Sequence, residues 1–360
     1  MKRLVLSGIN LFTGGTLQIY KKLIEQLGKK GYDKKYKIVA FVHKKEYFDE
    51  IKCHVKYIEI PDGRNYLKRM YYEEVFFYKW SKDKHIDIWI AMHDLSPKVV
   101  AKKRYTYYHT PQIFYNMPFL KAVLDLRCFL RSKFYRYFVA THVKETTGVI
   151  VQAHWIKEKF EQMFKGCNII VARPEETEAA SVPRVYFHKE YTFFYPSFPR
   201  VFKNFEVICE ACRILNRKDF EYKVLITIKG NENRYAKWLY RKYGDVKNIK
   251  WLGILERKEI EKIYQEADVL IFSSTLETWG LPVTEWGKYG KPMILADLPY
   301  AYETAANEKL KVFFKADDAK KLAEIMAAQI CGKFMEYEDV AVGREEKQDE
   351  WERLLAIMLD

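Results

Sequence analysis

Residues 268–285 read Asp-Val-Leu-Ile-Phe-Ser-Ser-Thr-Leu-Glu-Thr-Trp-Gly-Leu-Pro-Val-Thr-Glu. The apolar run at the start predicts a buried strand, and Gly280-Leu281-Pro282 predicts the start of a helix because proline is favoured at the first helical position. Glu277 then lies in the loop and Glu285 within the first helical turn. Carboxylates accept hydrogen bonds from hydroxyls, and the amides and positive dipole at a helix start attract a diphosphate, so the arrangement suits a ligand that carries both. The structural alternative is that both glutamates only cap the helix.

Short apolar runs alternate with longer helical patterns through most of the 360 residues, which predicts an α/β fold with parallel sheets. A chain of this length exceeds the usual size of one hydrophobic core, so two domains are expected. The strands predicted in the first half are residues 3–7, 37–42, 55–60, 86–91, 105–109 and 148–151. Those predicted in the second half are residues 191–195, 222–228, 249–252, 269–272, 293–296 and 311–314.

The polar stretch 173–190 contains two prolines and neither hydrophobic period, so it is predicted to link the domains. Residues 1–172 would form an N-terminal domain. Residues 191–335 would form a C-terminal domain. The remaining residues, 336–360, are predicted to form helices that could pack at the domain junction.

The net charge of +14 is distributed unevenly along the chain. Residues 1–165 contain 32 Lys and Arg against 16 Asp and Glu, whereas residues 166–360 contain 30 against 32. A one-sided positive field attracts phosphate-rich partners or anionic membrane surfaces. Residues 64–72 and 127–138 interleave cations with aromatic and aliphatic side chains, as interfacial helices do. A solvated helix face over an aromatic core explains these two segments equally well.

No apolar stretch is long enough to span a bilayer as a helix, and residues 1–10 resemble a first strand more than a signal peptide. The six cysteines show no framework spacing, which favours reduced thiols and a cytoplasmic location. Peripheral attachment to the inner face of the cytoplasmic membrane is compatible with the basic first half. Cys209 and Cys212 fall in a helical pattern and are expected to pack in the core.

Gly14 and Gly15 separate the first predicted strand from a helix with apolar positions 17, 20, 24 and 27. A glycine pair there lets a phosphate or another part of a substrate approach the amides at the helix start. The pair matches neither the dinucleotide fingerprint nor a P-loop, and a structural turn is the alternative.

The chain resembles the group 1 glycosyltransferases of family 4, retaining enzymes of the GT-B architecture in which two Rossmann-like domains face each other across a cleft. Their common element E-G-F-G-L-P-x-x-E matches Glu277–Glu285 in its spacing and in its Gly-Leu-Pro centre. The flanking residues 251–253, 263–274 and 290–297 are also similar, in the family's order. The segments around Gly14-Gly15, residues 107–111 and residues 149–155 are similar more loosely.

The resemblance implies that residues 1–172 form a Rossmann-like domain on the acceptor side and residues 191–335 a Rossmann-like domain that binds the nucleotide sugar. It also implies roles for individual residues. Glu277 would hold hydroxyls of the donor sugar, Glu285 would hold the ribose, and His109 would line the donor sugar next to the reacting carbon. The donor-binding set implied by the resemblance is Gly14, Gly15, Arg200, Lys203, Gly253, Thr278, Trp279, Gly280, Leu281 and Glu285. A single histidine after a strand is otherwise often structural.

The family's cationic stretch G-R-x-x-x-x-K-G is only partly retained. Lys203 matches the lysine that neutralises the leaving diphosphate, whereas Ser197-Phe198 replaces Gly-Arg. Arg200 lies nearby but is displaced along the chain. Either Arg200 substitutes from a reshaped loop, or Lys203 and backbone amides stabilise the leaving group without it.

No D-x-D motif and no cluster with metal-ligand spacing occurs, so no metal or other cofactor is expected. Together with the absence of a metal motif, the resemblance implies a metal-independent, retaining hexosyltransferase-type enzyme that uses His109, Lys203 and Glu277 in catalysis. Its acceptor is expected to be a saccharide, lipid-linked or phosphate-bearing, in surface polysaccharide or lipopolysaccharide assembly, and a small soluble acceptor is the alternative. The alternatives are a nucleotide-sugar epimerase of the same fold, a non-catalytic sugar-nucleotide-binding protein, and a nucleic-acid-binding protein, although no nucleic acid partner is expected. The sequence does not identify the nucleotide, the sugar, the acceptor, the linkage or the oligomeric state.

Overall fold

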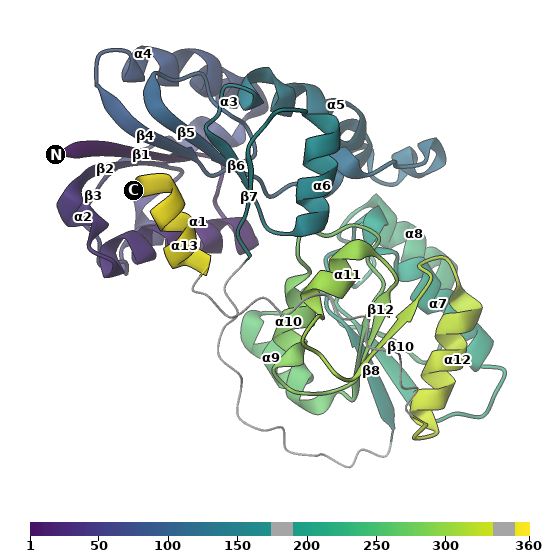
Figure 1. Cartoon of the computed structure of the whole chain (residues 1–360). Coiled ribbons are helices and arrows are strands. Elements are labelled where there is room, and N and C mark those ends of the chain that lie inside the picture. Colours follow the sequence, from purple (N-terminus) through teal and green to yellow (C-terminus); the bar gives the residue numbers. More distant parts are fainter. Residues whose placement is uncertain (174–189, 334–349) are drawn as a thin grey trace. The chain divides into compact units, whose positions relative to one another are not determined.

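The computed structural model describes residues 1–173, 190–333 and 350–360. The chain divides into two compact units, each built on one parallel sheet (Figure 1). Unit 1 comprises Met1–Phe114, Lys133–Glu175 and Glu346–Asp360, and unit 2 comprises Tyr115–Ser132 and Glu176–Glu345. The predicted α/β class with two Rossmann-like parts is therefore confirmed. The predicted linker, apart from its end residues, lies outside the described residues.

The sheet of unit 1 has the strand order β3-β2-β1-β4-β5-β6-β7. Its strands are β1 (Lys2–Gly8), β2 (Tyr36–Val42), β3 (Val55–Glu59), β4 (Ile86–Ala91), β5 (Ala101–Tyr107), β6 (Gly148–Val151) and β7 (Ile169–Val171). Its helices are α1 (Gly14–Lys29), α2 (Tyr32–Lys35), α3 (Tyr66–Tyr71), α4 (Phe77–Ser81), α6 (His154–Met163) and α13 (Glu350–Leu359). Helix α5 (Leu126–Val143) begins in the segment that belongs to unit 2 and continues into unit 1. The central strands are apolar almost throughout because a parallel sheet is usually covered on both faces.

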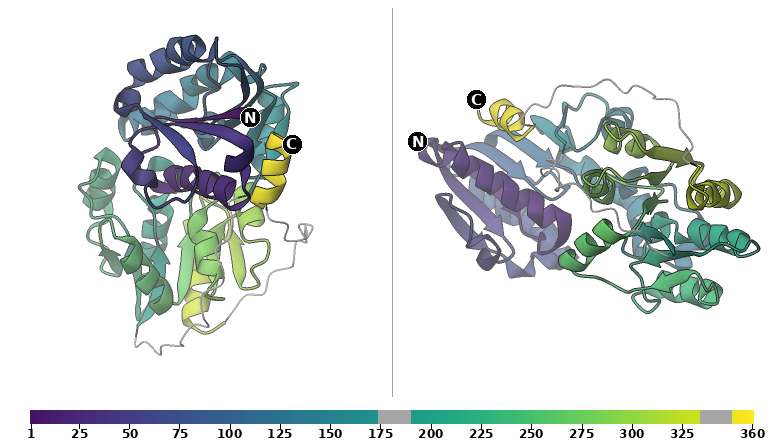
Figure 2. Two further views of the ribbon diagram at one scale, coloured as in Figure 1. Left: turned by 90° about the vertical axis from the view of Figure 1, so that its left-hand side faces the viewer. Right: turned by 90° about the horizontal axis from the view of Figure 1, so that it is seen from below.

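Helices α1 and α13 pack against one face of this sheet, where Figure 2 shows α13 in yellow beside α1 in purple. The four predicted apolar positions of α1 are all buried. From α13, Trp351, Leu354 and Met358 join the same core as Leu4 of β1, and the backbone carbonyl of Leu359 accepts a hydrogen bond from a tyrosine of β2. The described C-terminal helix is thus part of the core of unit 1, while residues 334–349 lie outside the described residues.

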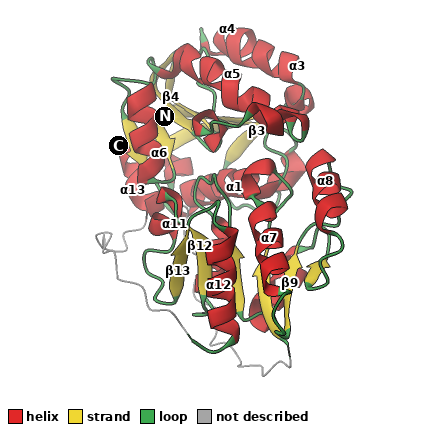
Figure 3. Cartoon of the chain, turned by 90° about the vertical axis from the view of Figure 1, so that its right-hand side faces the viewer, coloured by secondary structure: helices red, strands yellow, loops and turns green. Residues whose placement is uncertain are grey.

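The sheet of unit 2 has the strand order β10-β9-β8-β11-β12-β13. Its strands are β8 (Tyr191–Tyr195), β9 (Tyr222–Ile226), β10 (Ile249–Trp251), β11 (Val269–Phe272), β12 (Met293–Ala296) and β13 (Lys311–Phe314). Its helices are α7 (Phe205–Leu215), α8 (Arg234–Tyr243), α9 (Arg257–Glu266), α10 (Leu281–Gly287), α11 (Pro299–Thr304) and α12 (Ala319–Ile330). Figure 3 shows α7 and α12 side by side against this sheet. Cys209 and Cys212 are buried, free thiols on α7, as expected.

All twelve predicted strands are present, most with small differences at their ends, although β5 begins at Ala101 rather than at residue 105. One strand, β7, was not predicted, because a run of three apolar residues is too short to distinguish from a loop. Strand β5 ends at Tyr107, so His109 lies in the loop beyond the strand rather than at its end. The segment Tyr115–Ser132, which the sequence placed in the first domain, packs with unit 2. No helix in the described parts of the chain is long and apolar enough to cross a membrane.

Candidate functional site

The predicted donor residues of unit 2 gather at the carboxyl edge of its sheet. The strand order reverses between β8 and β11, and the loops that follow parallel strands at such a reversal form the usual ligand crevice of an α/β sheet. The loop after β8 leads to Lys203, and the loop after β11 carries Glu277. Lys203 and Glu277 therefore lie at the same edge of the sheet, each in the segment that follows one of the two strands at the reversal.

Lys203 and Glu277 form an ion pair between Nζ and Oε1. The lysine side chain is 16% exposed and the glutamate side chain 13% exposed, so the pair is largely shielded from water but still reachable by a ligand. The Lys203 ammonium also lies 5.6 Å from the ring centroid of Phe202 and 5.7 Å from that of Phe272. A cation over two aromatic rings in a partly desolvated place is held in position and keeps a strong field.

The backbone around Lys203 is fixed from several sides. The hydroxyl of Tyr195 donates a 2.7 Å hydrogen bond to the carbonyl of Lys203, and Ser273 Oγ donates a 3.1 Å bond to the same carbonyl. The next residue, Asn204, has a φ of 54°, and its side-chain amide donates a 2.7 Å bond to the carbonyl of Ala316. The short polar side chain of asparagine tolerates this left-handed conformation. The turn therefore sets the point from which the lysine reaches Glu277.

Glu285 lies in the second turn of α10, one residue beyond the predicted first turn, because the helix begins at Leu281. Its Oε1 is paired with the guanidinium of Arg257, and its Oε2 accepts a 3.0 Å hydrogen bond from the hydroxyl of Tyr264. Burial, followed by the charge of Glu285, raises the pKa of Tyr264 well above its usual value, so this phenol remains a donor at neutral pH. The carboxylate is thus oriented by two groups from α9, neither of which was predicted.

A pocket of about 190 Å³ opens beside Glu285. Its lining residues come from the ends of three neighbouring strands and from α9 and α10, and they are Pro196, Ser197, Phe198, Thr227, Ile254, Leu255, Ile260, Tyr264, Pro282 and Glu285. The loop after β8 is tied to the end of β9 because Ser197 N donates a 2.7 Å bond to Thr227 Oγ1. The pocket therefore combines apolar walls with one carboxylate at its edge, which suits a flat ring carrying a hydroxylated sugar.

The remaining predicted residues of unit 2 differ in accessibility. Thr278 is partly exposed and Leu281 is exposed, but the side chain of Trp279 is only 4% exposed. Its indole packs in the core, so only its backbone could meet a ligand. Gly280 has a φ of 88° with the rings of Phe272 and a tyrosine close by, and Gly253 has a φ of 85°. Both positions require glycine because other residues rarely adopt such a φ.

Arg200 is held by an acidic residue rather than free at the site. Its Nη1 lies 3.4 Å from both carboxylate oxygens of Asp125, and its guanidinium lies 5.6 Å from the ring centroid of Phe198. Asp125 is buried and also accepts a 3.1 Å bond from the Cys128 amide near the start of α5. Arg200 would have to leave this carboxylate to contact a diphosphate.

His109 lies in unit 1 in a dense network of hydrogen bonds. Its Nε2 is 3.0 Å from the carbonyl of Met92, Gln152 Nε2 is 3.3 Å from its Nδ1, and its ring stacks on Tyr107. A hydrogen on Nε2 satisfies both contacts, because the carbonyl accepts and the amide donates. The carboxylate of Asp94, which has a φ of 72°, accepts a 2.6 Å bond from the His109 amide. Burial lowers the pKa of His109, so its ring is neutral at pH 7.

Gly14 and Gly15 begin α1 after β1, and both are exposed. Gly14 has a φ of 74°, and nothing lies within 4 Å of where a Cβ would be. No acidic residue lies in the first turn of α1, and no side chain caps it. The start of this sixteen-residue helix therefore offers amides toward an anion, as expected from the sequence.

Within the described residues, no group of three or more His, Cys, Asp and Glu side chains is arranged to hold a metal ion. The metal-independent mechanism stays a prediction.

Comparison with known families identifies the site-bearing unit. Residues 177–333 match the glycosyl transferases group 1. This group 1 region contains Lys203, Glu277 and Glu285, so the predicted resemblance to group 1 is confirmed where its motifs are densest. The narrower assignment to family 4 stays a prediction. A comparison with curated proteins finds no match.

Solved structures extend the likeness in fold over the whole chain. The apo form of the lipopolysaccharide outer core galactosyltransferase WaaB is similar at a TM-score of 0.64 and 15% identity, with 99% of each chain covered. Sucrose-phosphate synthase from Thermosynechococcus elongatus has the same TM-score and identity, covering 99% of this chain and 95% of that one. HepE from Anabaena in complex with UDP and glucose has a TM-score of 0.61 and 13% identity, covering 93% and 92%. The fold class is therefore GT-B.

Proposed function

We propose that this protein is a retaining, metal-independent glycosyltransferase that moves a sugar from a nucleotide-sugar donor to a saccharide acceptor. The observation that carries the proposal is the Lys203–Glu277 pair at the reversal of the second sheet, next to the pocket at Glu285, within the group 1 region. A cation for a diphosphate, a carboxylate for sugar hydroxyls and a second carboxylate for a ribose are all present at one sheet edge.

Donor binding would exchange partners within this set. The nucleobase would enter the pocket between Ile254 and Pro282, and the ribose hydroxyls would donate to Glu285. The diphosphate would take the ammonium of Lys203, which frees a Glu277 oxygen to accept from a hydroxyl of the donor sugar. Opening this ion pair costs little when each charge finds a new partner, here the anionic diphosphate for the ammonium and a hydroxyl donor for the carboxylate.

The leaving group would be stabilised by fixed positive charge. As the glycosidic bond breaks, negative charge grows on the diphosphate, and a preorganised cation such as Lys203 lowers that barrier most when water is scarce. Arg200 would add to this field only after leaving Asp125. By the family resemblance, the leaving phosphate oxygen would help deprotonate the acceptor on the same face, His109 would line the donor sugar, and no side chain would act as a nucleophile.

Donor screening tests the assignment of the pocket. We expect one of the UDP-, GDP-, ADP-, CMP- and dTDP-sugars to raise the melting temperature, since a ligand at 100 times its Kd stabilises a fold by about 2.7 kcal/mol. UDP-sugars are the first to try, because HepE forms complexes with UDP and UDP-glucose. Glu285→Gln should raise the Kd for that donor roughly 5- to 100-fold, as expected when a charged hydrogen-bond acceptor is lost.

The exposed Glu221 on unit 2 provides the matched control, and Glu221→Gln should bind the donor like the wild type. Equal donor affinity in Glu285→Gln and wild type would remove Glu285 from the site. Stabilisation by none of the five donors would count against the proposal as a whole.

The alternatives separate in a simple assay. Incubation with the donor alone would yield an epimerised sugar if the protein were a nucleotide-sugar epimerase. Donor binding without turnover on any saccharide acceptor would favour a non-catalytic sugar-nucleotide-binding protein. Binding of oligonucleotides at physiological salt would favour the nucleic-acid-binding alternative.

We further propose that the protein works at the inner face of the cytoplasmic membrane on a lipid-linked saccharide, as in surface polysaccharide or lipopolysaccharide assembly. The segment Tyr115–Ser132 supports this proposal through side chains that no core covers. Five of its large apolar residues are exposed, namely Phe119 (79%), Leu120 (88%), Val123 (71%), Leu126 (54%) and Leu130 (45%). Arg127 and Arg131 are exposed on the same segment. Apolar side chains that insert, flanked by cations, fit an anionic bilayer surface.

Vesicle sedimentation tests membrane attachment. The wild type should bind vesicles that contain anionic phospholipid, and Phe119→Ser/Leu120→Ser should weaken this binding by at least about tenfold, because two large apolar side chains no longer insert. Met163 and Leu310 are also exposed but lie outside this segment, so Met163→Ser/Leu310→Ser is the control that should bind normally. Equal binding by both double variants would contradict the assignment of the segment.

A further inference from the structure

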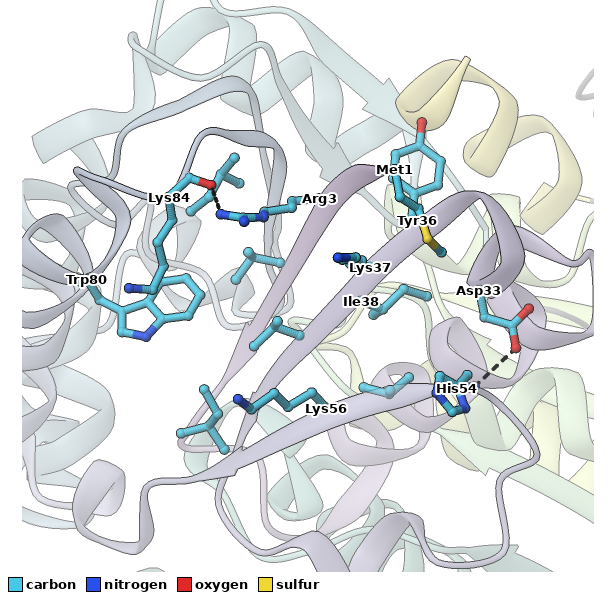
Figure 4. Close-up of a pocket in the computed structure, with 15 residues that line it drawn as sticks. Met1, Arg3, Asp33, Tyr36, Lys37, Ile38, His54, Lys56, Trp80 and Lys84 are labelled. Atoms are coloured by element: carbon cyan, nitrogen blue, oxygen red, sulfur yellow. Dashed lines mark hydrogen bonds between the residues drawn. The ribbon is translucent and has the colours of Figure 1, made fainter.

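A larger pocket, of about 810 Å³, lies in unit 1 at the amino edge of the sheet (Figure 4). Residues near the amino ends of β1, β2 and β3 line it. Trp80, Lys84 and Ile86 also line it. Gly14, Gly15 and His109 follow the carboxyl ends of β1 and β5, at the opposite edge of the same sheet. This pocket is therefore separate from every residue assigned to sugar transfer.

Cations from three neighbouring strands stand on one face of the sheet at this pocket. Arg3 of β1 is in register with Lys37 of β2, and Lys56 of β3 is in register with Val39, the next residue of β2 on the same face. Adjacent strands are only about 4.8 Å apart, so these like charges repel one another. Lys84 lies across from them, with its ammonium 4.9 Å from the centroid of the Trp80 ring.

These cations are not neutralised by the protein. Among the described residues, no carboxylate lies within ion-pair distance of Lys37, Lys56 or Lys84, and the Arg3 guanidinium donates to the backbone carbonyl of Lys84. Asp87 is next to Arg3 in the sheet, but its Oδ1 already forms an ion pair with Lys102 Nζ at 2.7 Å. Its Oδ2 accepts a hydrogen bond from the backbone amide of Arg3. Asp33 also lines the pocket and accepts a 3.1 Å hydrogen bond from the His54 amide. Arg3, Lys37 and Lys56 are exposed and can therefore bind an external anion.

The floor between the cations is apolar. Val5 is buried, whereas Val39 and Ile58 are only partly buried, and the indole of Trp80 forms a side wall. Farther along the same face, Phe41 and Trp89 are buried against Phe77 of α4. Parallel sheets are normally covered on both faces, so a stretch of this face that is only partly covered is unusual.

We propose that this pocket binds a single amphiphilic phosphomonoester, with its phosphate among Arg3, Lys37 and Lys56 and its apolar chain on Val39, Ile58 and Trp80. A phosphate carries nearly two charges and three acceptor oxygens, which match several cations at once. The concave shape suits one molecule rather than a bilayer surface. This site goes beyond the proposed glycosyl transfer and does not depend on it.

Isothermal titration with octyl phosphate, kept below its micelle concentration, tests the proposal on the full-length protein. Octyl phosphate should bind, inorganic phosphate should bind more weakly, and uncharged octanol should not bind measurably. Affinity should rise from hexyl to octyl phosphate, by up to roughly fourfold for each added methylene that is fully buried. Equal affinity for inorganic and octyl phosphate would refute the apolar half of the site.

Charge reversal locates the binding. Lys37→Glu/Lys56→Glu should weaken octyl phosphate binding by at least about tenfold, because two charge-assisted contacts become repulsive. Lys159 and Lys165 are exposed elsewhere in unit 1, so Lys159→Glu/Lys165→Glu is the matched control and should leave affinity within about twofold. Both variants change only exposed side chains and should keep the wild-type melting temperature. No binding by the wild type, or equal binding by the two variants, overturns the proposal.

Discussion

Glu277→Gln is expected to lower kcat/KM for sugar transfer by about 10²- to 10³-fold, the usual cost of one preorganised polar contact at a reacting centre. Glu277 is proposed to accept hydrogen bonds from the hydroxyls of the donor sugar, and the amide cannot match the charge that strengthens those bonds. The amide oxygen can still accept from Lys203, so the unfolding free energy should change by less than about 1 kcal/mol. Initial rates and denaturant titrations measure the two quantities separately.

Glu221→Gln again serves as the control and should keep full activity, because this exposed glutamate lies outside the site. If Glu277→Gln retained activity within about threefold of the wild type, the assigned role of Glu277 would be wrong. A large loss of stability with activity per folded molecule preserved would assign Glu277 to the fold rather than to the reaction.

Lys203→Met is expected to lower kcat by about 10²-fold, since it removes the cation that would face the growing charge on the diphosphate. It should also destabilise the fold by about 1–3 kcal/mol, because it leaves the largely buried Glu277 carboxylate without its partner. Lys203→Arg keeps the charge on a wider, planar group, so we expect partial activity from it. Steady-state assays with the identified donor, run well below each melting temperature, distinguish the effects.

The exposed Lys218 is the matched control, and Lys218→Met should behave like the wild type. The double variant Lys203→Met/Glu277→Gln provides a further check. If the pair acts as one unit in the transition state, the double variant should lose less transition-state stabilisation than the two single variants lose in sum. Strictly additive losses would mean that the two residues act independently.

Much of the proposed donor site was predictable because its signals are local in sequence. A strand that ends at Phe272 and a helix that begins with Leu281-Pro282 fix where Glu277 stands, whatever the rest of the chain does. The predicted turn of Glu285 was wrong by one residue, because helix starts are set by backbone geometry that sequence resolves only approximately. Glycines at 253 and 280 signalled backbone that needs a positive φ.

The partners of these residues were not predictable in the same way. Arg257 and Tyr264 reach Glu285 from α9, and Asp125 reaches Arg200 across 75 positions of sequence. Tyr264 lies in a segment that was recognised as similar to the family, but nothing in its spacing showed that its hydroxyl meets Glu285. Arg257 carried no signal at all. Trp279 looked like a ligand residue by its place in the motif, yet packing buries its indole.

The sequence alone determined the α/β class, twelve of the thirteen strands in the described part of the chain and the chemical types at the proposed donor site, because periodicity, turn residues and motif spacing act over a few neighbouring residues. Only the tertiary structure decided which charges are already paired, which side chains are buried and which stretch of sheet stays only partly covered. These properties depend on contacts between residues far apart in the chain, as in the pairing of Lys203 with Glu277 and the row of Arg3, Lys37 and Lys56. Burial and strand register set the local dielectric and the distances between charges, and therefore their interaction energies, and both arise only when the sheets assemble.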